Sequence, residues 1–278
     1  MKAITRLINE NLSGSYTVGE ISALTRIIAT ELLGVSQMAF YLKDDITLTT
    51  EQETLLDNAI ERLKKQEPIQ YILGYSDFCG LRFKVTPATL IPRPETSELV
   101  EWVASEAVGN EKILDIGTGS GCIAISLAHK LPQGKVTAWD ISPDALAVAT
   151  ENSKANGCNV EFEEVDILIH QPTGEQFDII VSNPPYIKEN EKEAMHSNVL
   201  NWEPHTALFV PDSDPLLFYR TIAKKGLTLL KPGGRLFFEI NRAHGKETVE
   251  MLAALGYTSI ELRKDFADND RMIRTIKD

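Results

Sequence analysis

The residues best suited to chemistry form one short run, and they are Asn183, Pro184, Pro185 and Tyr186. The segment 177–182 before them is apolar and β-branched, as in a strand that is buried on both faces of a parallel sheet. Two prolines prevent helix and further strand pairing, so we expect the chain to leave the sheet at Asn183 in a stiff, extended turn. Ligands bind at the carboxyl ends of strands in open α/β sheets, which makes this turn a candidate site.

The polar groups of this turn are suited to holding a planar amino group. The side-chain oxygen of Asn183 and the carbonyl of Pro184 can accept the two hydrogens of an –NH₂ group, and the ring of Tyr186 can stack on its plane. An amide or aromatic amine is a poor nucleophile, and holding both N–H bonds presents its nitrogen to a methyl donor. The alternative is a structural turn in which the tyrosine only packs.

A glycine-rich loop earlier in the chain predicts a cofactor site. The loop lies between Asp115 and Cys122 in the pattern Gly-x-Gly-x-Gly. A dinucleotide site would need a glycine where Cys122 stands, and the Asp115 carboxylate would repel a pyrophosphate but suit a cationic amino-acid ligand. The five loop residues are Gly117, Thr118, Gly119, Ser120 and Gly121.

Two further acids follow predicted strands on the same side of the sheet. Asp140 ends the strand 136–139, where an acid can accept hydrogen bonds from both ribose hydroxyls of a nucleoside. Asp166 follows the strand 160–165 and can accept from an adenine amino group. A ribose, an adenine and an amino-acid tail together indicate S-adenosylmethionine.

The elements that position these residues follow from hydrophobic periodicity. Strand patterns alternate with helical ones from Lys112 onward, which predicts a parallel, doubly wound α/β sheet with the strand 177–182 beside the strand 113–116. The final two strands are too close in sequence for a helical crossover and should pair antiparallel. The predicted strands are 113–116, 136–139, 160–165, 177–182, 235–240, 257–263 and 272–276, and the predicted helices are 122–130, one opened by Ser142-Pro143, about 215–230, and 246–255.

The chain before this sheet predicts two smaller parts. Residues 1–74 have helical periodicity, with capping-box patterns at Thr17 and Thr50, and predict a small helical bundle suited to partner recognition. Residues 75–86 predict a β-hairpin linker to a catalytic domain over 87–278. Near the start of that domain, the prolines on both sides of Arg93 predict a stiff extended segment, and Thr96 is expected to cap the helix that follows.

Composition bears on the class of function and on location. A chain of 278 residues with 43% hydrophobic content can form two domains. The net charge of −12 disfavours a protein that grips nucleic acid by its phosphates. Three scattered cysteines, no signal peptide and no long apolar span predict a cytoplasmic protein, and the five histidines lack metal-ligand spacing, so we expect no metal.

These motifs resemble the class I S-adenosylmethionine-dependent methyltransferases that act on planar amino groups. Within that class, the segments 67–74, 91–96, 183–187 and 203–208 resemble the peptide-chain release factor glutamine methyltransferases, the PrmC/HemK family, nearly end to end. The resemblance implies a Rossmann-like, seven-stranded sheet. It also implies that the side-chain amide nitrogen (N5) of the glutamine in the Gly-Gly-Gln motif of class-1 release factors is methylated, and that the N-terminal domain helps to bind the release factor.

The resemblance also implies roles for single residues. Ile167 stands where the family often has an aromatic residue against the adenine, and Asn241 and Asp268 stand where glycine is usual. Independently of the resemblance, we assign Arg93 and Glu95, as a hypothesis, to a stiff wall near the cofactor. The implied cofactor residues are Gly117, Thr118, Gly119, Ser120, Gly121, Asp140, Asp166, Ile167 and Asn183; the implied substrate residues are Asn183, Pro184, Pro185 and Tyr186, of which Asn183, Pro184 and Tyr186 are catalytic.

Three alternatives remain. A nucleic-acid methyltransferase of the adenine-N6 type shares the Asn-Pro-Pro-Tyr motif, but it predicts a basic face or a large recognition insert, and the sequence offers neither. A non-catalytic adaptor that binds S-adenosylmethionine would have little physical reason to keep that motif intact. An NAD-dependent oxidoreductase is disfavoured by Asp115 and Cys122.

Overall fold

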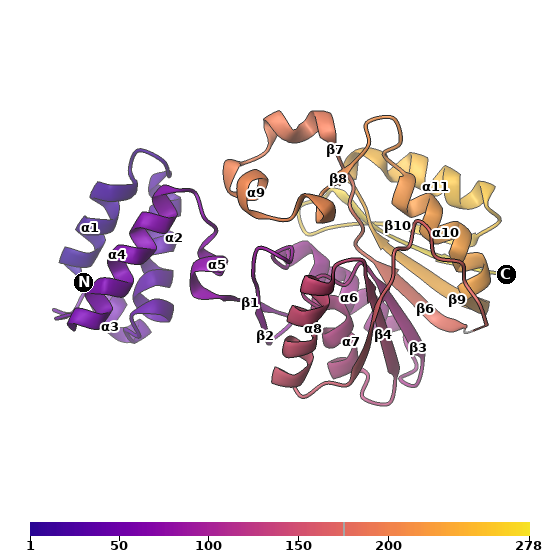
Figure 1. Cartoon of the computed structure of the whole chain (residues 1–278), viewed down its shortest axis with the longest axis horizontal. Helices are drawn as coiled ribbons and strands as arrows, with labels where there is room; N and C mark the ends of the chain where they lie inside the picture. The colour runs from indigo at the N-terminus through magenta and orange to yellow at the C-terminus, as the bar shows by residue number, and fades with distance from the viewer. Residues whose placement is uncertain (175) are drawn as a thin grey trace. The chain divides into compact units, whose positions relative to one another are not determined.

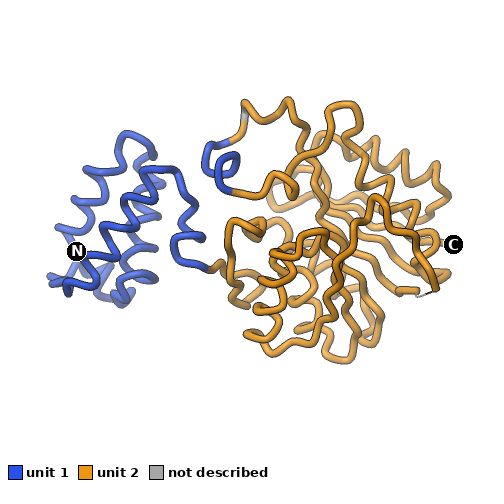
Figure 2. Tube along the Cα trace, in the orientation of Figure 1, with its two compact units in different colours: residues 1–74, 196–202 blue, residues 75–195, 203–278 orange. Residues whose placement is uncertain are grey.

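The computed structural model describes residues 1–174 and 176–278, which divide into two compact units (Figure 2). The first, which we call the helical unit, contains residues 1–74 and 196–202; the second, the sheet unit, contains residues 75–195 and 203–278. The chain thus returns to the helical unit for seven residues late in the sequence, which the hydrophobic pattern did not predict. Within that unit, the indole N–H of Trp202 donates to the carbonyl of Lys65 at 3.1 Å.

Capping residues and an apolar core define the helical unit. Thr17 and Glu20 form the predicted capping box, whereas the second box joins Thr49 to Gln52 and not Thr50 to Glu53. The helix begins one residue earlier than predicted, because adjacent threonines followed by adjacent Gln and Glu fit the pattern in either register. The helices are α1 (Lys2–Leu12), α2 (Val18–Ile27) continued by the π-helical turn Ile28–Leu32, α3 (Gln37–Leu42), α4 (Thr50–Lys64), α5 (Ile69–Leu73) and α9 (Ser197–Trp202).

The sheet unit begins with the predicted hairpin. Strands β1 (Tyr75–Phe78) and β2 (Leu81–Lys84) pair antiparallel, and helix α6 (Pro94–Glu106) follows. Thr96 is not the cap of α6, because the helix already starts at Pro94, whose missing N–H makes proline well suited to the first helical position. Thr96 therefore lies in the first turn of α6 with its side chain buried.

A sheet forms the centre of this unit (Figure 1). Its seven strands lie in the order β10-β11-β9-β6-β3-β4-β5. The five strands β9, β6, β3, β4 and β5 run parallel, and β11 pairs antiparallel with β9 and β10. This confirms the predicted fold, including the place of β6 beside β3. The strands are β3 (Lys112–Ile116), β4 (Lys135–Asp140), β5 (Val160–Glu164), β6 (Phe177–Ser182), β9 (Leu230–Glu239), β10 (Thr258–Lys264) and β11 (Asp270–Ile276).

Alternating side chains of the central strands supply two cores, one on each face of the sheet. Ile113 packs into the core that includes α6 and α7, while its neighbour Leu114 packs into the core that includes α10 and α11. β9 begins at Leu230, earlier than predicted, because Leu230 pairs with Phe177 before a register shift. The covering helices are α7 (Cys122–Lys130), α8 (Pro143–Ala155), α10 (Leu217–Leu229) and α11 (Gly245–Ala254).

Short elements surround the carboxyl ends of the parallel strands. Strands β7 (Ile187–Lys188) and β8 (Phe209–Val210) form a small parallel pair, and three 3₁₀ turns cover Glu189–Ala194, His205–Ala207 and Arg242–His244. None of the helices in the described ranges combines the length and the apolar character that crossing a membrane requires.

Candidate active site

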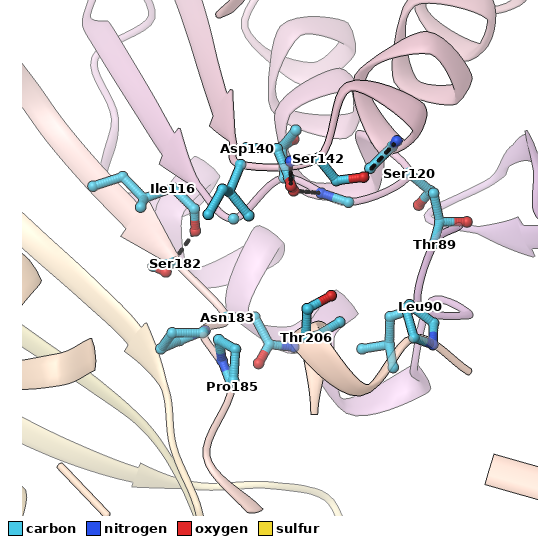
Figure 3. Close-up of a pocket in the computed structure, with 18 of the residues that line it drawn as sticks. Thr89, Leu90, Ile116, Ser120, Asp140, Ser142, Ser182, Asn183, Pro185 and Thr206 are labelled. Atoms are coloured by element: carbon cyan, nitrogen blue, oxygen red, sulfur yellow. Dashed lines mark hydrogen bonds between the residues drawn. The ribbon is translucent and has the colours of Figure 1, made fainter. Parts of the chain in front are cut away.

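A cavity of about 350 Å³ opens at the carboxyl ends of β3, β4 and β6 (Figure 3). Ile116, Asp140 and Ser142 lie on one side of it, and Asn183, Pro185 and Thr206 lie on the other (Figure 3). The structure brings ten of the predicted site residues to its lining, and these are Gly117, Thr118, Gly119, Ser120, Asp140, Asp166, Ile167, Asn183, Pro184 and Pro185. Among the described lining residues, Gly121 and Tyr186 are not found.

The glycine loop exposes its backbone to the cavity. Its first two N–H groups, from Gly117 and Thr118, donate to the carbonyl of Trp139 at 2.8 and 3.0 Å, which ties the loop to β4. Gly117 and Gly119 have positive φ angles of 78° and 55°, and a Cβ at either position would meet no atom within 4 Å. Gly121 differs, since its Cβ would come within 2.7 Å of Ile125 Cδ1. Gly121 therefore serves the packing of the loop on α7.

The carboxylate of Asp140 is held in a fixed orientation at the end of β4. Its two oxygens accept hydrogen bonds from the N–H groups of Gly119 at 2.8 Å and Ser142 at 2.9 Å. Burial raises the pKa of Asp140, and these backbone donors act in the opposite direction. Each carboxylate oxygen has a further lone pair, so Asp140 can still accept from two ligand hydroxyls.

Asp166 and Ile167 form the next part of the wall. One carboxylate oxygen of Asp166 accepts from the N–H of Leu168 at 2.8 Å. Ile167 is 8% exposed and lines the cavity with an apolar side chain next to that acid. A polar edge next to an apolar surface suits an adenine, which has a hydrogen-bonding edge and an apolar face.

Asp115 lies behind the loop and not in the cavity. Its side chain is fully buried and accepts a hydrogen bond from the Thr118 hydroxyl at 2.6 Å. Burial raises the pKa of Asp115 to about 7. The structure thus places this carboxyl where it supports the loop, and it does not line the cavity as a direct partner for a cationic group.

The turn after β6 presents the amide of Asn183 in a defined orientation. Thr96 donates its hydroxyl hydrogen to Glu239 Oε2 at 2.6 Å, so the hydroxyl oxygen is left to accept from Asn183 Nδ2 at 3.2 Å. Because the amide nitrogen is used in that bond, the amide oxygen of Asn183 points away from Thr96. Pro184 follows in a buried position that also lines the cavity.

Tyr186 is anchored away from the lining. Its hydroxyl donates to Glu239 Oε1 at 3.2 Å, and its carbonyl accepts from Asn241 Nδ2 at 3.2 Å. Its ring packs against the core that includes α10 and α11. Burial raises the pKa of Tyr186, and the nearby Glu239 charge raises it further. The contact of this ring with a substrate amide stays a prediction.

Several residues of the site were missed by the sequence reasoning. Thr96 was assigned to a cap, and Glu239 was seen only as a strand residue, although a lone acid among Phe, Phe and Ile is a signal for a buried polar partner. Glu203, which is 4% exposed, accepts from the N–H of Ile91 at 3.1 Å and from Arg93 Nη2 at 2.6 Å. Arg93 lines the cavity, which gives this arginine a place beside it.

The residues around this cavity fit S-adenosylmethionine. The open backbone of the glycine loop leaves room for a close ligand, Asp140 offers acceptors for a ribose, and Asp166 with Ile167 offers a polar edge and an apolar surface. The cavity volume also lies in the range of small-molecule sites, about 300–1,000 Å³.

Comparison with known proteins decides the family. Two family models match the chain, the PrmC N-terminal domain over residues 7–74 and the methyltransferase small domain over residues 95–202. The release factor glutamine methyltransferase of Bacteroides thetaiotaomicron is 48% identical over 98% of this chain and 99% of its own length. The chain belongs to the release factor glutamine methyltransferase family. A second member, from Flavobacterium psychrophilum, is 47% identical over 95% of this chain and 94% of its own length.

Solved structures agree on the fold of this family member. A methyltransferase from Pyrococcus furiosus is 21% identical, with a TM-score of 0.54 over 80% of this chain and 98% of that one. A T. thermophilus 16S rRNA methyltransferase in complex with AdoMet and guanosine is 16% identical, with a TM-score of 0.51 over 73% of this chain and 50% of that one. These structures agree with the class I sheet of this chain. Membership of the family makes the protein an S-adenosylmethionine-dependent methyltransferase.

Proposed function

We propose that this protein methylates the side-chain amide nitrogen (N5) of the glutamine in the Gly-Gly-Gln motif of class-1 peptide-chain release factors. The observation that carries this proposal is the orientation of Asn183. Its amide nitrogen is tied to Thr96, which leaves its oxygen to accept a hydrogen from a substrate –NH₂ group. The names of the relatives support a release factor as the substrate.

The reaction needs a planar amide held in one orientation. The Asn183 side-chain oxygen and the Pro184 carbonyl accept the two N–H hydrogens of the glutamine, so that its nitrogen lone pair lies along the direction of attack. Bound S-adenosylmethionine supplies an electrophilic methyl group. The proton leaves the nitrogen after transfer, so Asn183 and Pro184 complete the step without a strong general base.

We assign the cofactor to the cavity wall opposite Asn183. Gly117, Thr118, Gly119 and Ser120 would contact its amino-acid part, Asp140 its ribose, and Asp166 with Ile167 its adenine, with Gly121 acting through loop packing. The ring of Tyr186 would approach the glutamine amide from the core side of the turn.

The helical unit would recognise the release factor. Its α3 has no buried residue, and Met38, Tyr41 and Leu42 are all more than two-thirds exposed. Apolar side chains exposed together on one helix suit a protein partner better than a nucleic acid. The three free cysteines support a reducing compartment, and we propose that the protein acts in the cytoplasm.

Competition among acceptors tests the proposal. Equal amounts of release factor, double-stranded DNA and rRNA are incubated with the protein and labelled S-adenosylmethionine. We expect label in the release factor alone, at its glutamine. Label in nucleic acid alone would contradict the proposal and favour a nucleic-acid amine as substrate.

A further inference from the structure

We propose that Thr96 and Glu239 form a relay that sets which end of the Asn183 amide faces the substrate, and that this relay makes the site select a glutamine over a glutamate. The inference rests on the proposed function, because it concerns how the same site recognises its acceptor. Neither Thr96 nor Glu239 was assigned a part in chemistry by the sequence motifs.

The relay consists of three polar side chains from three elements of the sheet unit. Glu239 ends β9, Thr96 lies in the first turn of α6, and Asn183 follows β6. Thr96 and Glu239 are each only 2% exposed, so bulk water does not compete for their hydrogen bonds. Thr96 also lines the cavity, at the point where its oxygen accepts from Asn183.

The direction of each hydrogen bond follows from the carboxylate. An ionised Glu239 has no hydrogen to give, so the hydroxyls of Thr96 and Tyr186 both donate to it, one to each oxygen. Burial raises the pKa of Glu239, whereas the hydrogen bonds from Thr96 and Tyr186 and the positive charge of Arg271 act in the opposite direction and favour this ionised form. With its single hydrogen used, Thr96 can only accept from Asn183, so it binds the amide nitrogen and rejects the amide oxygen.

The consequence is a fixed polarity at the substrate. The side-chain oxygen of Asn183 faces the incoming side chain. This oxygen accepts a hydrogen from the –NH₂ group of a glutamine and repels the oxygens of a glutamate. Without the relay, the amide of Asn183 can rotate by half a turn and present its nitrogen, which would suit a glutamate. Thr96 and Glu239 are thus positioning residues that act through Asn183.

The test compares binding of two acceptors to the full-length protein. The wild-type release factor and a variant with glutamate in place of its target glutamine are titrated, with S-adenosylhomocysteine present so that no turnover occurs. We expect the wild-type enzyme to bind the glutamate form at least about tenfold more weakly, the effect of one mismatched buried hydrogen bond. Thr96→Val keeps the shape of the side chain and removes the hydroxyl. In this variant the ratio of the two dissociation constants, glutamate form over glutamine form, should fall toward one, and kcat for the glutamine form should decrease.

Three further variants separate the relay from a structural role. Thr96→Ser keeps the hydroxyl and should restore the discrimination. In Glu239→Gln the new amide can turn either end toward Thr96, so this variant should lose part of the discrimination between glutamine and glutamate. It provides the test if Thr96→Val does not fold. Thr248→Val removes a fully buried hydroxyl that donates to the carbonyl of His244, just before α11, and it should keep both the ratio and kcat.

The possible failures are distinguishable. A wild-type enzyme that puts no methyl on the release factor glutamine contradicts the proposed function and this inference with it. An active enzyme that binds both acceptors equally, or whose Thr96→Val and Glu239→Gln variants keep the wild-type ratio, overturns the relay alone.

Discussion

At the scale of single residues, the site depends on groups that are held before any ligand arrives. Asp140 is fixed by the backbone N–H groups of Gly119 and Ser142, and Asn183 is fixed by Thr96. Fixed donors and acceptors avoid the cost of ordering side chains during the reaction. The chemistry of the site therefore depends on buried neighbours as much as on the motif residues.

Replacing Asn183 tests its role in turnover. In Asn183→Ala the glutamine loses an acceptor for one N–H, so we expect kcat to fall about 100-fold or more while the dissociation constant of S-adenosylmethionine changes little. Single-turnover rates and calorimetric titration of the cofactor measure the two effects. Asn156→Ala, at the end of α8 and away from the cavity lining, is the matched control. Near-normal turnover in Asn183→Ala would show that this acceptor does not drive the step.

The buried Asp115 makes stability depend on pH. Its pKa is raised from 3.8 to about 7 in the folded protein, so the folded state binds the proton more tightly than the unfolded state. The stability from this proton is full below pH 3.8 and is lost as pH rises through about 7. Asp115→Asn cannot ionise and should lose less stability over this range. In the absence of cofactor, the free energy of unfolding of Asp115→Asn minus that of the wild type should increase from pH 4.5 to 8. The increase should be up to about 1.4 kcal/mol for each unit by which the pKa of Asp115 differs between the folded and unfolded states.

Urea unfolding at several pH values measures this difference. An offset between Asp115→Asn and the wild type that stays constant across the range would show that the carboxyl titrates alike in the folded and unfolded states.

At the scale of elements, the loop between β3 and α7 joins binding to packing. Gly117 and Gly119 leave its backbone open on the cavity side, whereas Gly121 lets the loop pack against the side chains of Ile125 and Ala149. One glycine pattern thus meets two requirements, a close approach for a ligand and a close approach between elements.

Substituting Gly121 separates these two requirements. In Gly121→Ala the new methyl would meet the fully buried Ile125 side chain at 2.7 Å, in a backbone conformation with φ of 81°. We expect the free energy of unfolding to fall by about 2–4 kcal/mol, measured by denaturant titration. Gly157→Ala, with φ of 64° and no atom within 4 Å of its Cβ, carries the backbone strain alone and should cost about 1 kcal/mol. Equal losses in the two variants would mean that Ile125 moves aside freely.

The helices and strands also show which features of the fold can be predicted from the sequence. Alternating strands and helices predicted a parallel sheet with the strand 177–182 beside the strand 113–116, because periodicity and chain connectivity are local signals, and the short final connection predicted the antiparallel last pair. The predicted register of the second capping box was wrong, because neighbouring residues fit two registers equally well. The predicted start of β9 was wrong, because Leu230 pairs with Phe177 across a register shift that local periodicity does not show. The bonds from Thr96 and Asn183 to their partners were beyond the sequence, since they join residues far apart in the chain through the tertiary fold.

At the scale of the whole molecule, the chain passes between two compact units more than once. Residues 196–202 belong to the helical unit, and the segment that follows them places Glu203 against Ile91 and Arg93 in the sheet unit. The two units are therefore joined by the chain both at residue 74 and in the segment between β7 and β8.

Removing residues 1–74 tests the division of labour between the units. The truncated protein keeps every residue of the cavity lining, so we expect the dissociation constant of S-adenosylmethionine to stay within about threefold of the full-length value. The KM for release factor should rise about tenfold or more, because the surface that we propose to recognise the partner is lost. Cofactor titration confirms that the sheet unit is folded, and steady-state kinetics then measures KM. An unchanged KM would make the helical unit a purely structural part of the protein.

The most direct test of the central claim is to locate the transferred methyl group. Release factor is incubated with S-adenosylmethionine and either the wild-type protein or Asn183→Ala, digested, and sequenced by tandem mass spectrometry. We expect one added methyl on the side-chain amide nitrogen of the glutamine in the Gly-Gly-Gln motif with the wild-type protein, and almost none with Asn183→Ala. A methyl on any other residue, or no methyl on the release factor while another acceptor is modified, would contradict this expectation.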